Sequence, residues 1–190
     1  MEADWEVEIG GGAHVIDALW PGFVDLCGNP ERVVEVRETV PFPALGDALV
    51  RINATGSPVW TSKCDVWNVD EFDPDELDAP AESALGAKAC YVDLLPRNDG
   101  QWPAVAEATE WCRKLCLRIR EVPLRCARAD LIVREAVVSV EKMGLGVTAY
   151  VTACGSDLED AAWRLGSALA ALADSIAPKA PPAAGASKLQ

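Results

Sequence analysis

The most regular hydrophobic pattern in this chain lies in residues 102–122, and its period fixes what the segment can form. Apolar side chains recur there at alternating spacings of three and four residues: Val105, Ala108, Cys112, Leu115, Ile119 and Val122. This spacing puts them on one face of an α-helix, and Pro123 ends the helix because proline cannot continue it. We therefore predict an amphipathic helix over 102–122 whose apolar face packs on a neighbouring layer.

The remaining segments carry strand or helix patterns of their own. Alternating or β-forming residues predict strands at 32–40, 59–67, 89–95, 128–138 and 146–154. The segment from Pro43 to Gly56 is predicted to form a helix, because proline suits the first helical turn, an apolar face follows, and glycine ends the helix. Residues 156–176 are predicted to form the last helix, opened by a capping box at Ser156 and Glu159.

From residue 32 these elements follow the order β-α-β-β-α-β, and then one further strand and one helix. This order resembles the ferredoxin-like plait, a superfold of the α+β class. The resemblance implies an antiparallel sheet with its helices on one face and the strands at 59–67 and 89–95 side by side. Because a superfold hosts many functions, the resemblance implies none of them.

The chain also divides by composition. Residues 32–176 are long enough for a single α+β domain with its own core. Residues 1–31 fit the plait less well, and we expect an N-terminal arm or edge strand packed on that core. Residues 177–190 are small, Pro-rich and without periodicity, so we expect a disordered tail.

Strand alternation also sorts side chains between the two faces of the predicted sheet. In the stretch 59–67, one face is expected to carry Trp60, Ser62, Cys64 and Val66, and the other Thr61, Lys63, Asp65 and Trp67. Cys64 and Lys63 then point to opposite sides, which excludes a catalytic pair. The residues expected to face the helices elsewhere are Val34, Val36, Cys90, Val92, Leu94, Leu131, Val133, Val147, Ala149 and Val151.

The face turned away from the helices is the candidate binding surface, because it mixes aromatic rings with charges of both signs. Its candidate binding residues are Arg37, Lys63, Asp65, Trp67, Tyr91, Asp93, Arg134 and Tyr150. Aromatic and arginine side chains dominate the hot spots of interfaces. The alternative is a solvated sheet with weak cross-strand ion pairs.

Net charge limits the partners of the chain. With 30 acidic and 17 basic residues, its formal charge is −13. Nucleic acids and anionic membranes are bound by clustered Lys and Arg, so we expect neither as a partner, whereas a basic protein would suit this charge. No apolar run approaches the roughly 20 residues of a membrane span, and the acidic N-terminal segment does not resemble a secretory signal. We expect a cytoplasmic protein.

Seven of the 17 basic residues lie between Arg113 and Arg134, mostly off the helical stripe. They could hold an anionic ligand, or they could attract the acidic connection at 70–82. We favour the second interpretation, since seven of the thirteen residues in that connection are Asp or Glu.

The seven cysteines do not form a metal-binding pattern. The sequence has no Cys-x-x-Cys, and His14 is its single histidine. We therefore expect no metal and no cofactor, and we expect the cysteines to be reduced and mostly buried. His14 follows a glycine run that we interpret as a flexible joint, with a role as general base as the alternative.

These observations favour a non-catalytic interaction protein that recognises a protein partner or a small ligand through the sheet face away from its helices. An immunity-type inhibitor of a basic toxin is one concrete form, and a homodimer through that face is expected. The alternative is a small enzyme on the same face, with Asp65, Asp93 or Asp130 as base and Tyr91 or Tyr150 as proton donor.

Overall fold

The computed structural model describes residues 1–12, 20–97, 102–139 and 142–177 of the 190-residue chain. Its strands are β1 (Glu2–Glu8), β2 (Val59–Val69), β3 (Gly86–Pro96), β4 (Ala127–Ser139) and β5 (Lys142–Gly155). Its α-helices are α1 (Pro43–Ile52), α2 (Val105–Arg120) and α3 (Leu158–Ile176). Short 3-10 helices, η1 (Pro30–Glu35), η2 (Arg37–Thr39), η3 (Asp75–Leu77) and η4 (Ala81–Ser83), lie in the connections.

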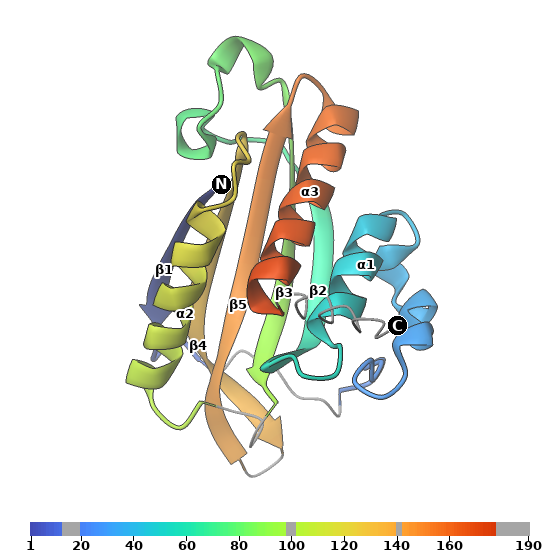
Figure 1. Ribbon diagram of the computed structural model, residues 1–190, viewed down its shortest axis with the longest axis vertical. Coiled ribbons are helices and arrows are strands. Elements are labelled where there is room, and N and C mark those ends of the chain that lie inside the picture. Colours follow the sequence, from blue (N-terminus) through green and yellow to red (C-terminus); the bar gives the residue numbers. More distant parts are fainter. Residues whose placement is uncertain (13–19, 98–101, 140–141, 178–190) are drawn as a thin grey trace, which may run out of the picture.

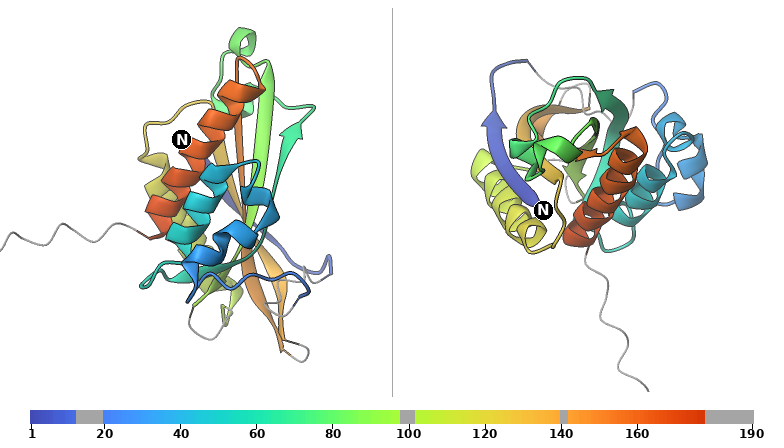
Figure 2. Two further views of the ribbon diagram at one scale, coloured as in Figure 1. Left: turned by 90° about the vertical axis from the view of Figure 1, so that its right-hand side faces the viewer. Right: turned by 90° about the horizontal axis from the view of Figure 1, so that it is seen from above.

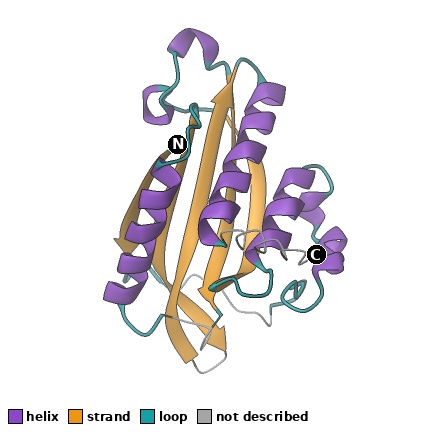
Figure 3. Ribbon diagram, in the orientation of Figure 1, coloured by secondary structure: helices purple, strands orange, loops and turns teal. Residues whose placement is uncertain are grey.

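The strands form one five-stranded sheet in the order β1-β4-β5-β3-β2, with β1 and β2 at its edges (Figure 1 and Figure 3). Neighbours from β4 to β2 are antiparallel, whereas β1 runs parallel to β4. The α+β class and the antiparallel pairing of the strands at 59–67 and 89–95 are confirmed. The prediction of an entirely antiparallel sheet is wrong, because the strand that completes it comes from the N-terminal segment and joins β4 in parallel.

Helices α1, α2 and α3 cover one face of the sheet, as Figure 2 shows from the side and from above. Helix α2 packs on β1 and β4, α3 packs on β5 and β3, and α1 lies against α3 near β2. The strand residues predicted to face the helices are buried where they lie in strands: Cys90, Val92, Leu94, Leu131, Val133, Val147, Ala149 and Val151. Each buried valine or leucine among them stabilises the fold by roughly 1.5–3 kcal/mol relative to exposure.

Helix α3 begins with a different cap from the predicted one. Its N-cap is Asp157, whose Oδ1 accepts the backbone N–H of Asp160 at 2.8 Å. The Asp160 carboxylate in turn accepts the backbone N–H of Ser156 at 3.0 Å. The capping box predicted at Ser156 and Glu159 is therefore wrong by one residue, although two reciprocal side-chain caps do open the helix.

The strand predicted at 32–40 is wrong, because these residues form η1 and η2 instead. Val33 and Val36 pack against the core, and the Thr39 side chain is buried, with its hydroxyl 3.1 and 2.8 Å from the carbonyl oxygens of those two valines. A spacing of three residues suits a 3-10 helix, in which side chains at i and i+3 align. Val34, predicted to be buried, is 75% exposed. The order of elements along the chain is nevertheless retained, because β1 supplies the first strand.

The acidic connection between β2 and β3 packs more closely than predicted. Leu77 and Ala84 form a small hydrophobic cluster with Ala87 and Cys154 at one end of the sheet. The Asp78 carboxylate accepts from the Arg125 guanidinium at 3.0 and 3.3 Å. This contact supports the interpretation that the basic cluster attracts the connection, although both side chains are exposed and such pairs contribute less than about 1 kcal/mol.

Candidate functional site

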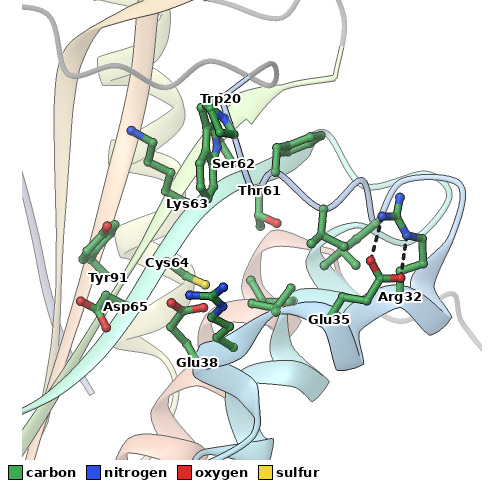
Figure 4. A pocket seen from close by; sticks show the side chains of 18 residues that line it. Trp20, Arg32, Glu35, Glu38, Thr61, Ser62, Lys63, Cys64, Asp65 and Tyr91 are labelled. Carbon is green, nitrogen blue, oxygen red and sulfur yellow. Dashed lines mark hydrogen bonds and ion pairs between the residues drawn. The ribbon is translucent and has the colours of Figure 1, made fainter.

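A pocket of about 790 Å³ lies along the free edge of β2, between this strand and the segment that contains η1 and η2 (Figure 4). Residues 20–26, both 3-10 helices and β2 supply most of its lining, and Tyr91 of β3 joins them. The volume falls within the range of about 300–1,000 Å³ that small-molecule sites occupy. We call this hollow the β2 pocket.

A β-bulge in β2 brings two polar side chains to this pocket. The ladder with β3 pairs Thr61 with Leu94 and then Cys64 with Val92, so Ser62 and Lys63 together oppose the single residue Asp93 and β2 contains one extra residue. Both side chains line the β2 pocket. Bulges of this kind bend an edge strand and change the direction of its side chains.

The bulge also reverses the facing predicted for the first part of β2. Thr61, expected to face away from the helices, is buried beside α1, and the Asn53 amide donates to its hydroxyl at 2.6 Å. Trp60, expected on the helix side, packs with Leu95 and Ala136. Both predictions are wrong, because a period of two does not continue through an inserted residue.

One end of the β2 pocket is built around the Trp20 indole. Lys63 Nζ lies 5.7 Å from the centroid of that ring, a cation–π distance, and Figure 4 shows Ser62 and Lys63 beside it. Within the described residues, the buried Nε1 of Trp20 and the buried Oγ of Ser62 have no hydrogen-bond partner. An unsatisfied buried polar group costs about 1–3 kcal/mol, so a bound molecule with a suitable acceptor would remove part of that cost.

The charged side chains of the pocket balance in number. They are Arg32, Arg37 and Lys63 against Glu35, Glu38 and Asp65. Arg32 and Glu35 neutralise each other through two hydrogen bonds of 2.9 and 2.8 Å at the rim. Lys63 and Arg37 have no ion-pair partner within the described part of the chain. Glu38 and Asp65 likewise have no ion pair among these residues, so the pocket presents two cations and two carboxylates to a polar ligand.

The titratable groups nearest the centre are held neutral. Burial, followed by the charges of Glu38 and Asp65, raises the pKa of the Cys64 thiol to about 12. Burial, followed by Asp93 and Asp65, raises the pKa of Tyr91 to about 12. At neutral pH, Cys64 is therefore a poor nucleophile and Tyr91 is a hydrogen-bond donor rather than a base.

Three aromatic rings gather on the sheet face away from the helices, and we call them the aromatic cluster: Trp67, Tyr91 and Tyr150. Their centroids lie 6.2 Å (Trp67–Tyr91), 6.5 Å (Trp67–Tyr150) and 6.0 Å (Tyr91–Tyr150) apart. The Arg134 guanidinium lies over Tyr150 at 5.5 Å and also pairs with Glu8 at 2.7 Å. Because Tyr91 lines the β2 pocket as well, the cluster and the pocket adjoin.

The same face is not uniformly exposed. Asp93 and Thr148 are both buried, and the Thr148 hydroxyl donates to the Asp93 carboxylate at 2.7 Å. Burial raises the pKa of Asp130, and two hydrogen bonds from Arg128 of 2.8 and 3.0 Å partly oppose that effect.

The predicted site residues divide into three groups. Trp67, Tyr91, Arg134 and Tyr150 come together as the aromatic cluster and its arginine. Lys63, Asp65, Tyr91 and Arg37 all line the β2 pocket. Arg37 was expected in a strand, and this placement is wrong because it belongs to η2. Asp93 lies on β3 but is buried, with 5% of its surface exposed.

Sequence reasoning missed Trp20, Ser62 and Glu38 as pocket residues. The segment before η1 has no periodicity that would place Trp20 near β2, and an inserted residue in a strand leaves no single-sequence signature. His14, the alternative general base, lies outside the described residues. Among the residues that the structure describes, no three His, Cys, Asp or Glu side chains gather as metal ligands, and no helix is long and apolar enough to cross a membrane.

Comparison with protein families, with curated proteins and with solved structures finds no match for this chain. The functional argument therefore depends on the geometry of the β2 pocket and the aromatic cluster.

Proposed function

We propose that this protein is a non-catalytic binding protein that holds a small molecule in the β2 pocket. The observation that carries the proposal is a pair of buried polar atoms without partners, Trp20 Nε1 and Ser62 Oγ, in two residues that line a pocket of about 790 Å³. Buried polar groups are nearly always hydrogen-bonded, so a pair left unpaired beside a hollow favours a ligand that completes them.

The lining favours a ligand with a flat apolar part and an oxygen acceptor. The ring of Trp20 offers a surface for the flat part, and its indole N–H needs an acceptor. Lys63 would add a charge to that hydrogen bond, which favours a carboxylate over a neutral oxygen. A neutral Cys64 and a neutral Tyr91 support binding rather than covalent chemistry at this site.

A thermal-shift screen of aromatic carboxylates and their neutral amides tests the proposal. We expect compounds that raise the melting temperature of the wild type, with an affinity at least tenfold weaker for Trp20→Leu. Trp163→Leu is the matched control, because Trp163 is 67% exposed and lies outside the pocket lining. A screen without hits, or hits that bind Trp20→Leu as well as the wild type, would contradict the proposal.

A second candidate function is association with a protein through the aromatic cluster, either as a homodimer or with a basic partner. The observation that favours it is Trp67, a large apolar side chain that is 37% exposed beside two tyrosines. Light scattering against concentration tests this candidate. Loss of the Trp67 anchor should weaken association by about 2 kcal/mol or more. A wild type that stays monomeric and binds no basic protein would remove this candidate.

A further inference from the structure

Two cysteines lie side by side where β4 begins and β5 ends. The ladder of these strands pairs Ala127 with Ala153, so the next rung brings Cys126 opposite Cys154. The backbone N–H of Cys154 donates to the Cys126 carbonyl at 3.0 Å, which confirms that rung. The bond holds the two residues side by side at this end of the sheet, which is the proximity that a disulfide requires.

The environment brings these two thiols into contact while leaving one accessible. Burial, followed by the neighbouring Cys126 thiol, raises the pKa of the Cys154 thiol to about 11. Cys154 is fully buried, whereas Cys126 is half-buried. Cys126 also has a φ of 59°, a left-handed backbone that is unfavourable for a residue other than glycine. It lies immediately before β4, outside the strand itself.

The other neighbouring cysteines lack this combination. Cys112 and Cys116 lie one turn apart on α2 and are both buried. Because both thiols are buried, a disulfide oxidant in solution reaches neither of them. Cys64 and Cys90 are diagonal neighbours across β2 and β3, since Cys64 pairs with Val92 and Cys90 with Val66. Diagonal positions are separated by about 7–8 Å.

We propose that Cys126 and Cys154 are a modification site, where a small disulfide oxidant such as oxidised glutathione forms a reversible bond between them. The Cys126 thiolate attacks one sulfur of the oxidant and releases one glutathione thiol. The Cys154 sulfur, on losing its proton, displaces the second glutathione and closes the protein disulfide. Two S–H bonds are lost, one S–S bond forms, and the two protons and two electrons leave on the two glutathione thiols.

The bond would fasten the start of β4 to the end of β5, beside the hydrophobic cluster that contains Leu77 and Ala84. Because β3 lies between β5 and the edge strand β2, the link should leave the β2 pocket unchanged. The oxidised chain should therefore melt a few degrees higher, since the link constrains the unfolded chain.

The experiment incubates the full chain in glutathione redox buffers and follows intact mass, free thiols and linked peptides. All seven cysteines are free in the structure, and we expect oxidation to remove two thiols, with the mass of two hydrogen atoms lost and one peptide joining Cys126 to Cys154. A reducing agent should restore both thiols.

Cys126→Ser should abolish the change, whereas the matched control Cys27→Ser, at another half-buried cysteine, should retain it. Circular dichroism of both variants shows that they are folded. The proposal is overturned if all seven thiols persist, if Cys126 only accumulates a mixed disulfide with glutathione, or if the linked peptide joins another pair.

Discussion

Asn53 connects α1 to the edge strand that carries the pocket, and its replacement by alanine is the most informative test of that arrangement. The side chain is 2% exposed and makes three hydrogen bonds to α1 and β2, besides accepting one of 3.6 Å from the Cys27 thiol. Its Nδ2 donates to Leu49 O at 2.9 Å and to Thr61 Oγ1 at 2.6 Å, and its Oδ1 accepts the Thr61 N–H at 3.1 Å. Alanine removes all three bonds and leaves the Thr61 N–H buried without this acceptor.

The expected loss follows from these contacts. Each intramolecular hydrogen bond contributes about 0.5–1.5 kcal/mol net, so three bonds give roughly 3 kcal/mol. For a chain of this size, 1 kcal/mol shifts the melting temperature by about 2–4 °C. Asn53→Ala should therefore lower the melting temperature by about 6–12 °C.

Urea unfolding and calorimetry measure this difference, with Asn68→Ala as the matched control. Asn68 is exposed and accepts one hydrogen bond from Lys88 Nζ at 2.8 Å, so its loss should change stability by less than about 0.5 kcal/mol. An Asn53→Ala variant as stable as the wild type, within the same 0.5 kcal/mol or so, would refute the packing of α1 against β2.

Three further predictions concern the core and the titration of the chain. Gly86→Ala should lower the free energy of unfolding in urea by about 2 kcal/mol, because the added Cβ would lie 2.8 Å from the Asp157 carbonyl carbon. Gly28→Ala is the control, since a Cβ there has nothing within 4 Å and should not destabilise the chain. Equal effects of the two substitutions would contradict the packing of β3 against α3. Ultraviolet titration should give Tyr91 a pKa of about 12 in the folded protein. Since that pKa is raised above the unfolded value, its contribution to stability is complete below about pH 10 and is lost as pH rises toward 12, and an ordinary Tyr91 titration would contradict its burial. Cys112, fully buried with a pKa raised to about 12, should resist thiol reagents until the chain unfolds, and rapid labelling would show that α2 is misplaced.

The helices and the antiparallel core strands could be predicted from the sequence because their patterns are long and unambiguous. The buried face of α2, with Cys112, Leu115 and Ile119, repeats a helical period that few other structures share. Val147, Ala149 and Val151 of β5 likewise alternate with polar neighbours.

Short segments with two compatible periods were not predictable. Val33 lies in η1 and Thr39 in η2, with Val36 between them in an extended conformation, yet the same stretch reads as alternating when Val34 is included. Tertiary contact with α1 decides between these patterns, and a single sequence does not contain that contact. For the same reason the sequence predicts the first strand at 32–40, and it predicts the segment that contains β1 only as an arm or edge strand.

The candidate site depends on features that local periodicity does not encode. The β2 pocket requires the bulge at Ser62 and Lys63 and the approach of Trp20 from a segment without regular structure. Lys63, Asp65 and Tyr91 were predicted as surface residues of a sheet face, and they reach the pocket because β2 is an edge strand. Arg37 reaches it from η2 instead.

The most direct test of ligand binding in the β2 pocket is the indole N–H signal of Trp20 in an NMR titration with an aromatic carboxylate. That N–H is buried without a partner among the described residues, so we predict that it moves downfield as it donates to the ligand. The exposed Trp163 indole should stay unchanged in the same titration. A bound ligand that shifts Trp163 and leaves Trp20 unmoved would place the binding site elsewhere and contradict the proposed function.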